Sequence, residues 1–144
     1  MDKKKLTETD IRTKFITPAI EQAGWSQTSQ IREEVQITKG KILVRGNKHK
    51  RGDVKKADYI LSPKPGIPLA VVEAKDNNHN IGDGIQQALG YSRLHGDLPF
   101  VFSSNGDGFL FHDRTTTDGP IETELALSEF PSPEELWQRY RTYK

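Results

Sequence analysis

The run Pro68–Lys75 (PLAVVEAK) constrains this chain most, because it is apolar on both faces of a strand until its last three residues. Successive side chains of a β-strand alternate between the two faces of a sheet, so Leu69 and Val71 share a face with Glu73 and Lys75. A strand that is apolar on both faces is buried between two layers. The pattern therefore predicts a covered sheet in which a carboxylate and an amine lie at the end of a buried strand.

A second apolar strand is predicted at Ala57–Ser62 (ADYILS), joined to the first by the turn-forming residues PKPGI. If the turn is centred on its Pro-Gly pair, Leu61 lies opposite Ala70 in the antiparallel hairpin. The same register places Asp58 directly opposite Glu73. Two acidic side chains are therefore expected to face each other across neighbouring strands.

Two carboxylates ~4 Å apart repel by about 4 kcal/mol at an effective dielectric constant of about 20, and the adjacent Lys75 relieves only part of this. A divalent cation relieves it, and Mg²⁺ prefers hard oxygen ligands. We predict a Mg²⁺ site, with Mn²⁺ as a substitute, formed by Asp58, Glu73 and the backbone carbonyl of Ala74. Lys75 would then orient and help to deprotonate an attacking water while the metal stabilises charge on phosphorus. The alternative is a salt-bridged strand end in which Lys75 neutralises Glu73.

The remaining pattern indicates alternating helices and strands. A first helix is expected to start with a cap at Thr7 and Asp10, to be loosened at Pro18 and to end at Gly24. The other expected elements are strands at Ile31–Thr38, Lys41–Val44, Pro99–Ser104 and Phe109–His112, a loop at Arg114–Glu124, and helices at about Ile81–Leu94 and from Ser132. The fold class predicted from this order is α/β, with a central mixed β-sheet flanked by helices.

Positive charge is concentrated in one segment. Between Lys39 and Lys56 eight basic residues stand against Asp53 alone, a local balance of +7 in a chain whose formal net charge is +1. Such a segment suits a polyanion, although a solvated loop that only aids solubility is the alternative. The basic side chains predicted to bind DNA are Arg45, Lys48, Lys50, Arg51, Lys55 and Lys56.

Composition excludes several classes of site. The chain has no cysteine, which excludes disulfides, thiolate nucleophiles and cysteine-ligated zinc. The start of the chain lacks a secretory h-region, and no run approaches the ~18 apolar residues of a membrane span. No G-x-x-x-x-G-K-[ST] motif occurs, so no ATP site is expected in this chain. We expect a cytoplasmic protein without a membrane segment.

Three short motifs resemble, in order and spacing, those of the PD-(D/E)XK nucleases, including the Q-x-x-x-Y motif of the RecB-like branch: Ala57-Asp58, Glu73-Ala74-Lys75 and Gln87-Ala-Leu-Gly-Tyr91. The nearer match is the N-terminal nuclease domain of the R (HsdR) subunit of type I restriction enzymes. That family is also similar in three further stretches: Pro18 with Ala23-Gly24-Trp25, Pro99-Phe-Val-Phe, and Ser104-Asn105-Gly106. One departure is the alanine at position 57, where the family motif has a proline.

The resemblance implies a restriction-endonuclease-like core in which Asp58, Glu73 and Lys75 are the metal-binding and catalytic residues. It also implies that Glu8 reaches the site from the first helix, as an outer metal ligand or a group that orients water.

For Gln87 and Tyr91 the resemblance implies that they brace the site or contact the DNA backbone. The two residues are four apart and so lie on one face of a helix. A plain hydrogen-bonded or core role is the alternative.

The sequence therefore predicts a Mg²⁺-dependent endonuclease domain that hydrolyses the phosphodiester bonds of double-stranded DNA, the DNA-cleavage module of a type I restriction-modification R subunit. The resemblance implies M (methylation) and S (specificity) subunits as partners, with ATP used only in the full-length subunit. We expect residues 1–144 to form a single nuclease domain excised from a longer subunit, weak or inactive alone, whose helix at 133–144 leads toward the missing motor. The alternative is a non-catalytic DNA-binding or subunit-docking module of the same fold, which would have no metal site at Asp58 and Glu73.

Overall fold

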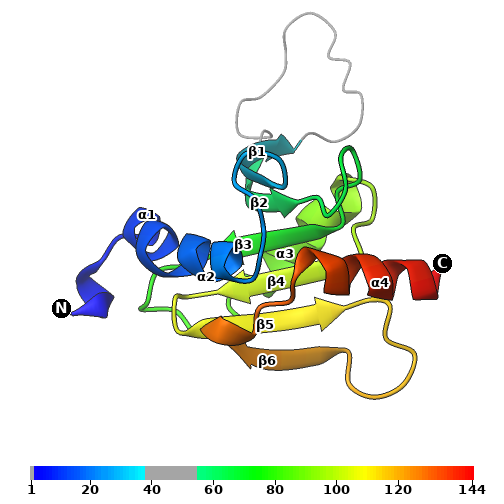
Figure 1. Cartoon of the computed structure of the whole chain (residues 1–144). Helices are drawn as coiled ribbons and strands as arrows, with labels where there is room; N and C mark the ends of the chain where they lie inside the picture. The colour runs from blue at the N-terminus through cyan, green and yellow to red at the C-terminus, as the bar shows by residue number, and fades with distance from the viewer. Residues whose placement is uncertain (1, 38–54) are drawn as a thin grey trace, which may run out of the picture.

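The structure is a computed structural model that describes residues 2–37 and 55–144 (Figure 1). In this part of the chain one six-stranded sheet follows the order of the sequence: β1 (Ile31–Ile37), β2 (Lys55–Leu61), β3 (Ala70–Ala74), β4 (Phe100–Ser104), β5 (Gly108–Asp113) and β6 (Glu122–Ala126). The helices are α1 (Glu8–Ile11), α2 (Thr17–Gln22), α3 (Ile85–Leu94) and α4 (Pro133–Tyr143). None of the helices in the described ranges has the length and apolar character that a bilayer-crossing helix needs.

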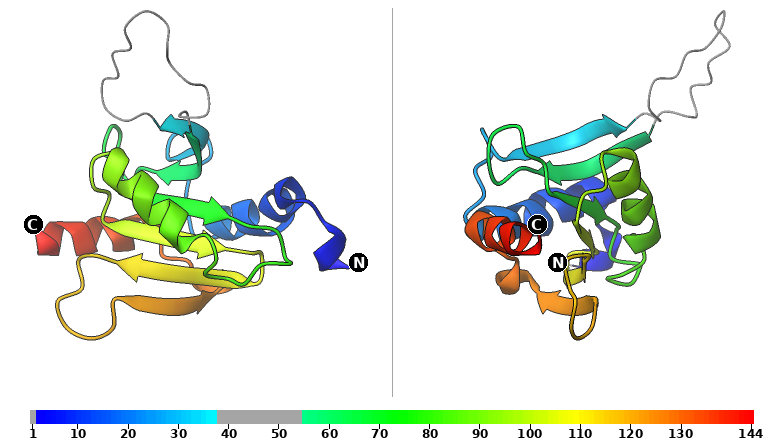
Figure 2. Two further views of the ribbon diagram at one scale, coloured as in Figure 1. Left: turned by 180° about the vertical axis from the view of Figure 1, so that it is seen from behind. Right: turned by 90° about the vertical axis from the view of Figure 1, so that its right-hand side faces the viewer.

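The sheet is mixed and lies between two helical layers. Helix α3 covers one face, whereas α1, α2 and α4 cover the other (Figures 1 and 2). Neighbouring strands run antiparallel except β3 and β4, which are parallel and are connected through α3. Parallel strands need such a crossover connection, since a short turn cannot return the chain to the same end of the sheet. The predicted α/β class with a mixed, helix-flanked sheet is confirmed.

The β2–β3 hairpin has the register that the sequence predicts. Leu61 pairs with Ala70, and the isolated bridge between Lys64 and Ile67 centres the turn on the Pro-Gly pair. The ladder stops at the pair Tyr59–Val72, one position before the two acidic residues. The hairpin therefore carries both acids to the place where its strands stop pairing.

Apolar clusters on both faces explain the composition of β3. On the face of α1, α2 and α4, the ring of Phe102 stacks on Phe111 with centroids 4.4 Å apart, and Phe130 lies 4.6 Å from Phe102. On the other face, Val71 belongs to a cluster that includes residues of α3. Because Val72 faces the first cluster and Val71 the second, both are fully buried, as a doubly covered strand requires.

The first helical segment shows the effect of Pro18. Helix α1 begins with a reciprocal capping box between Thr7 and Asp10, as predicted. A π-helical turn, Arg12–Ile16, follows, in which the N–H of Thr17 donates to the carbonyl of Arg12. Proline has no N–H and clashes with the carbonyl four residues earlier, so a wider turn accommodates it. The predicted loosening of the helix is this π turn.

Three expectations about secondary structure were wrong. The region expected to be a loop includes the start of β6, an edge strand whose side chains are largely exposed and so lack an apolar alternation. Strand β2 begins at Lys55, so Lys55 and Lys56 lie in a strand and not in the basic loop. Helix α3 begins at Ile85, four residues later than expected. The expected strand Lys41–Val44 lies outside the described residues.

The aromatic cluster should dominate the stability of the domain. Phe102 is fully buried and contacts three other phenylalanine rings. We expect Phe102→Ala to lower the free energy of unfolding by about 3–5 kcal/mol, because it removes buried apolar surface and leaves a cavity. Urea unfolding measures this, and Tyr143→Ala, at a side chain 54% exposed, should change stability by less than about 0.5 kcal/mol. Equal effects of the two substitutions would contradict the assignment of the core.

Candidate active site

Strands β2 and β3 separate at the acidic residues, and carboxylates accept the backbone hydrogen bonds there. The N–H of Ala74 donates to Oδ2 of Asp58 at 2.8 Å, and the N–H of Asp58 donates to Oε1 of Glu73 at 3.4 Å. Each acid thus accepts a hydrogen bond from the backbone of the other strand. The two carboxylates lie side by side, as the predicted register requires. They mark a fork, the point after the Tyr59–Val72 pair where β2 and β3 diverge.

Burial makes this acidic pair electrostatically strained. Asp58 is 9% exposed and Glu73 is 5% exposed. Burial raises the pKa of Glu73 to about 9, and the charge of Asp58 adds to the rise. Burial also raises the pKa of Asp58, opposed by the hydrogen bond from Ala74 and by the charge of Arg12. The pair therefore retains a proton at neutral pH, as expected for two acids that share a site of low dielectric constant.

The donor atoms at the fork fit a hard divalent cation. Mg²⁺ is commonly held by one or two carboxylates, with water and phosphate oxygens completing its shell. Asp58 and Glu73 supply two carboxylates side by side, and burial together with the charge of Asp58 raises the pKa of Glu73. Among residues 2–37 and 55–144 no group of three or more His, Cys, Asp or Glu is placed to hold a metal ion. Any further ligands would be oxygens of the backbone, such as the carbonyl of Ala74, or of water and phosphate.

A hydrogen-bonded chain connects the predicted lysine to α3. Nζ of Lys75 donates to Oε1 of Gln87 at 3.3 Å, and Nε2 of Gln87 donates to the hydroxyl of Tyr91 at 2.8 Å. Burial raises the pKa of Tyr91, the hydrogen bond from Gln87 lowers it, and the charges of Glu73 and Asp58 raise it further. Gln87 and Tyr91 thus lie beside Asp58 and Glu73, and Gln87 contacts the amine of Lys75. This is the arrangement that the predicted bracing role requires.

Helix α3 approaches the acids closely because residue 84 is glycine. The N–H of Gly84 donates to Oγ of Ser103 at 3.0 Å, and Ser103 pairs with Glu73 on the neighbouring strand. A Cβ atom on residue 84 would lie 3.0 Å from Oγ of Ser103 and 3.3 Å from Cγ of Glu73. A side chain there would push α3 outward, and with it the groups that contact Lys75.

The first helix brings two side chains to the site, of which the sequence predicted one. Glu8 lies at the exposed rim, where partial burial raises its pKa, the charge of Asp58 adds to the rise, and the charges of Lys75 and Arg12 oppose it. Arg12, which the sequence interpretation missed, places Nη1 3.8 Å from Oδ1 of Asp58. The available signal was its position one helical turn after Glu8, on the same face.

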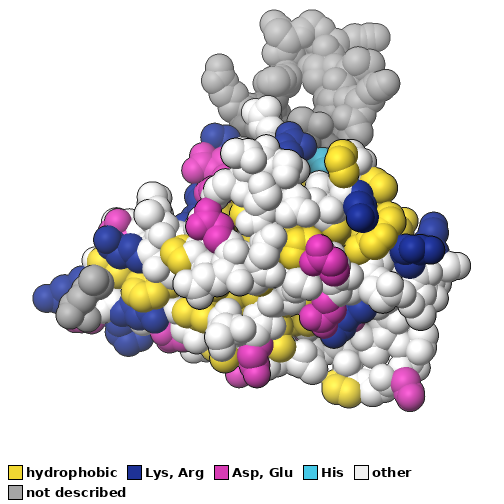
Figure 3. Space-filling view, in the orientation of Figure 1, with side chains coloured by type: hydrophobic (Ala, Val, Ile, Leu, Met, Phe, Trp, Pro, Cys, Tyr) yellow, Lys and Arg dark blue, Asp and Glu magenta, His cyan; other side chains and the backbone are white. Residues whose placement is uncertain are grey.

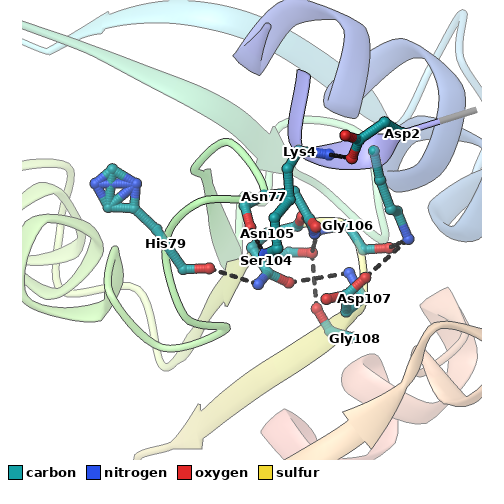
Figure 4. Close-up of polar contacts among 10 residues, drawn as sticks. Asp2, Lys4, Asn77, His79, Ser104, Asn105, Gly106, Asp107 and Gly108 are labelled. Atoms are coloured by element: carbon teal, nitrogen blue, oxygen red, sulfur yellow. Dashed lines mark hydrogen bonds and ion pairs between the residues drawn. The ribbon is translucent and has the colours of Figure 1, made fainter. Parts of the chain in front are cut away.

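Buried asparagines fix the loop that follows Lys75 (Figure 4). Nδ2 of Asn77 donates to the carbonyl of Asn105 at 2.9 Å, and Nδ2 of Asn105 donates to the carbonyl of His79 at 2.7 Å. Nζ of Lys4 donates to the carbonyl of Asn77 at 2.8 Å. These contacts therefore tie the loop at the end of β3 to the β4–β5 turn and to the N-terminal segment.

Only part of the predicted DNA-binding set can be placed. Lys55 and Lys56 are exposed at the start of β2, and Lys56 lies two positions before Asp58, on the same face of the strand. On the face shown in Figure 3, further basic side chains gather at the end of the molecule where the N terminus lies. The remaining members of the set lie outside the described residues: Arg45, Lys48, Lys50 and Arg51.

Comparison with known proteins relates these features to a family. Residues 47–119, which include every predicted site residue except Glu8 and Arg45, match the model of a family described as "Type I restriction enzyme R protein N terminus". The "Type I restriction enzyme EcoAI endonuclease subunit" of Escherichia coli is 54% identical over 140 residues, which are 96% of this chain and 17% of that protein. A solved fragment assigned to the HsdR subunit of a type I restriction enzyme from Vibrio vulnificus YJ016 superposes with a TM-score of 0.79 at 39% identity. That match covers 96% of this chain and 26% of the other, so this chain spans only a minor part of both relatives.

The hydrogen bond at the fork has a measurable effect on stability. Asp58→Asn keeps an oxygen that accepts from the N–H of Ala74 and removes a carboxyl group whose charged form burial disfavours, so this variant should be at least as stable as the wild type in metal-free buffer. Asp58→Ala leaves the buried N–H without that acceptor, and we expect it to be about 1–3 kcal/mol less stable than Asp58→Asn. Urea unfolding at neutral pH with chelator compares them. Equal stability of both variants would show that the hydrogen bond from Ala74 to Asp58 does not stabilise this end of the two strands.

The raised pKa of Glu73 predicts how stability depends on pH. The folded state holds a proton on this carboxyl up to about pH 9, whereas the unfolded state releases it near the ordinary glutamate pKa of 4.5. Because the folded state binds more protons in this window, its stability is greatest below it and falls as the pH rises through it. Glu73→Gln has no such proton to lose. The stability of the metal-free wild type should therefore fall relative to Glu73→Gln between about pH 5 and pH 9, and a constant difference in urea unfolding would refute this.

Proposed function

The chain belongs to the family of type I restriction enzyme R protein N-terminal domains, and from that premise we propose that it is the Mg²⁺-dependent endonuclease domain of a type I restriction-modification R subunit. Its reaction would be hydrolysis of phosphodiester bonds in double-stranded DNA. The observation that carries the proposal is the buried Asp58–Glu73 pair at the fork of β2 and β3, followed just after β3 by Lys75, whose amine donates to Gln87. The fold is restriction-endonuclease-like, similar to the solved HsdR fragment.

The acids of the fork would hold the ion. Asp58 and Glu73 offer carboxylate oxygens, and the carbonyl of Ala74 offers a third oxygen at the same strand end. These residues would release their shared proton when the ion binds, since a ligating carboxylate must be ionised. When bound, Mg²⁺, or Mn²⁺ in its place, supplies positive charge to the phosphate oxygens and activates a water molecule.

The chain's own side chains would position the reactants. Gln87 accepts from Nζ of Lys75 and is itself fixed by Tyr91, so the amine stays at the open end of the fork. From there Lys75 would orient the attacking water and help to deprotonate it. Glu8, at the rim, would orient a further water or act as an outer ligand.

The basic residues would hold the DNA backbone. Lys55 and Lys56 are exposed on the strand that carries Asp58, and phosphate contacts of this kind fix the register of DNA without reading its sequence. The basic residues before them in the chain, Arg45, Lys48, Lys50 and Arg51, would extend this contact. We further propose M and S subunits as partners and the use of ATP elsewhere in the full-length subunit, which corresponds to relatives several times longer than this chain.

The three predicted catalytic residues can be tested in the assembled restriction enzyme. We expect Asp58→Asn, Glu73→Gln and Lys75→Met each to lower the rate of DNA cleavage by about 100-fold or more, because each removes a group that acts on the reacting phosphate or water. Chelator should abolish cleavage by the wild type, and Mg²⁺ or Mn²⁺ should restore it.

Matched changes at exposed positions serve as controls. Glu124→Gln lies on the edge strand β6, and Lys64→Met lies in the β2–β3 turn at the other end of β3. Both should cut DNA within about twofold of the wild type. If the three site variants also cut normally, the domain is a binding or docking module and the proposed activity is wrong.

A further inference from the structure

One buried guanidinium contacts three carboxylates beside the candidate metal site. Arg12 is only 8% exposed. Its Nη2 lies 2.7 Å from Oε1 of Glu33, and its Nη1 lies 3.2 Å from Oε2 of Glu34 and 3.8 Å from Oδ1 of Asp58. The guanidinium also lies over the ring of Tyr59, 5.2 Å from its centroid. Arg12 therefore connects the first helical layer to β1 and to the acidic residue of β2.

Strand β1 is distorted at the same place. Glu33 pairs with Tyr59 and Val35 pairs with Ala57, but the intervening Glu34 has no ladder partner on β2. Glu34 has a φ of +53°, a left-handed conformation that residues other than glycine rarely adopt. The strand departs from regular geometry at the position opposite Asp58, and the side chain of Glu34 turns to the guanidinium of Arg12.

The guanidinium of Arg12 also has a buried N–H group without a hydrogen-bond acceptor in the part of the chain that the structure describes. Within the described residues Nε of Arg12 is buried without a hydrogen-bond partner, the one buried side-chain nitrogen or oxygen for which this holds. A left-handed glutamate and an unsatisfied N–H at one contact are departures from regular structure of the kind that cluster at functional sites. They indicate that the arrangement serves more than packing.

The contacts of Asp58 show what Arg12 does there. Oδ2 accepts from the N–H of Ala74, and Oδ1 faces Nη1 of Arg12, so the carboxylate is held at both oxygens. Glu34, on the neighbouring strand β1, brings negative charge close to it, whereas Glu73, on β3, lies within hydrogen-bond reach of it. The planar guanidinium of an arginine can contact several carboxylates at once. Arg12 can therefore both oppose the repulsion between the acidic side chains and fix the plane of the Asp58 carboxylate.

We propose that Arg12 is a positioning residue that orients the Asp58 carboxylate for the divalent ion. The inference rests on the proposed function, since it takes Asp58 to be a metal ligand. Groups that contact a metal ligand on the side away from the metal commonly contribute 10- to 100-fold to metal affinity, because the ligand is already oriented before the metal binds. Arg12 acts through Asp58 and does not itself contact the ion.

The test is a Mn²⁺ titration of the 144-residue chain, followed by the electron paramagnetic resonance signal of free Mn²⁺. The variant Arg12→Met/Glu34→Gln removes one positive and one negative charge, so the net charge around Asp58 is unchanged. The Met side chain still covers the ring of Tyr59. We expect the Kd for Mn²⁺ to rise by about tenfold or more, because the affinity then depends on an unheld carboxylate.

A second arginine in this chain is a matched control. Arg139 on α4 lies 2.6 Å from Oδ2 of Asp113 and 2.8 Å from Oε2 of Glu135, and its guanidinium lies 5.4 Å from the centroid of Phe111. This is the same kind of bridge, at the end of the sheet where Asp113 pairs with Phe100, away from Glu73. The variant Arg139→Met/Glu135→Gln should lose stability as well, but its Kd for Mn²⁺ should stay within about twofold of the wild type.

The outcomes separate this inference from the proposed function. If Asp58→Asn loses Mn²⁺ binding while Arg12→Met/Glu34→Gln binds within about twofold of the wild type, Arg12 has no positioning role and the metal site stands. If the wild type binds no more Mn²⁺ than Asp58→Asn, both proposals are wrong. If the double variant does not fold, Arg12→Lys decides, since it keeps the charge without the planar fork. It should weaken Mn²⁺ binding at least about threefold, and unchanged affinity overturns the inference.

Discussion

The repulsion between two buried carboxylates, Asp58 and Glu73, is the constraint on which the rest of the structure depends. In water these groups would separate, but the β2–β3 register holds them together at the fork and burial raises both of their pKa values. The protein offsets the cost with a backbone hydrogen bond from Ala74, a nearby guanidinium and a shared proton. Such a pair weakens the fold and, under the proposed function, would strengthen the attraction for a cation, a common exchange of stability for function.

The double coverage of the sheet makes this exchange possible. Apolar clusters on both faces hold β3 rigidly, so a strained pair can be kept at its end. Each helical layer also contributes one contact near the paired acids. Gln87 on α3 contacts the amine of Lys75, and Arg12 in the first helical segment contacts Asp58. The site therefore lies where two layers meet across the end of a sheet, and neither layer alone completes it.

The two arginine bridges show that similar contacts can have different meaning. Arg12 and Arg139 each bridge acidic side chains and lie over an aromatic ring. Arg139 joins α4 to the end of β5 in regular surroundings. Arg12 instead lies beside a left-handed glutamate and next to the paired acids, and this context, not the ion pair itself, is the basis of the positioning role proposed for it.

The sequence by itself determined what short-range geometry controls. A Pro-Gly turn and the alternation of β3 set the register that brings Asp58 opposite Glu73, and the spacing of Gln87 and Tyr91 sets their common helix face. Only the tertiary structure decided which helix meets which strand. Strand β6 was missed because an exposed edge strand depends on its neighbour for pairing rather than on an apolar pattern. Arg12 was missed because its partners come from two other strands, and a charged helix residue appears solvent-exposed until packing buries it.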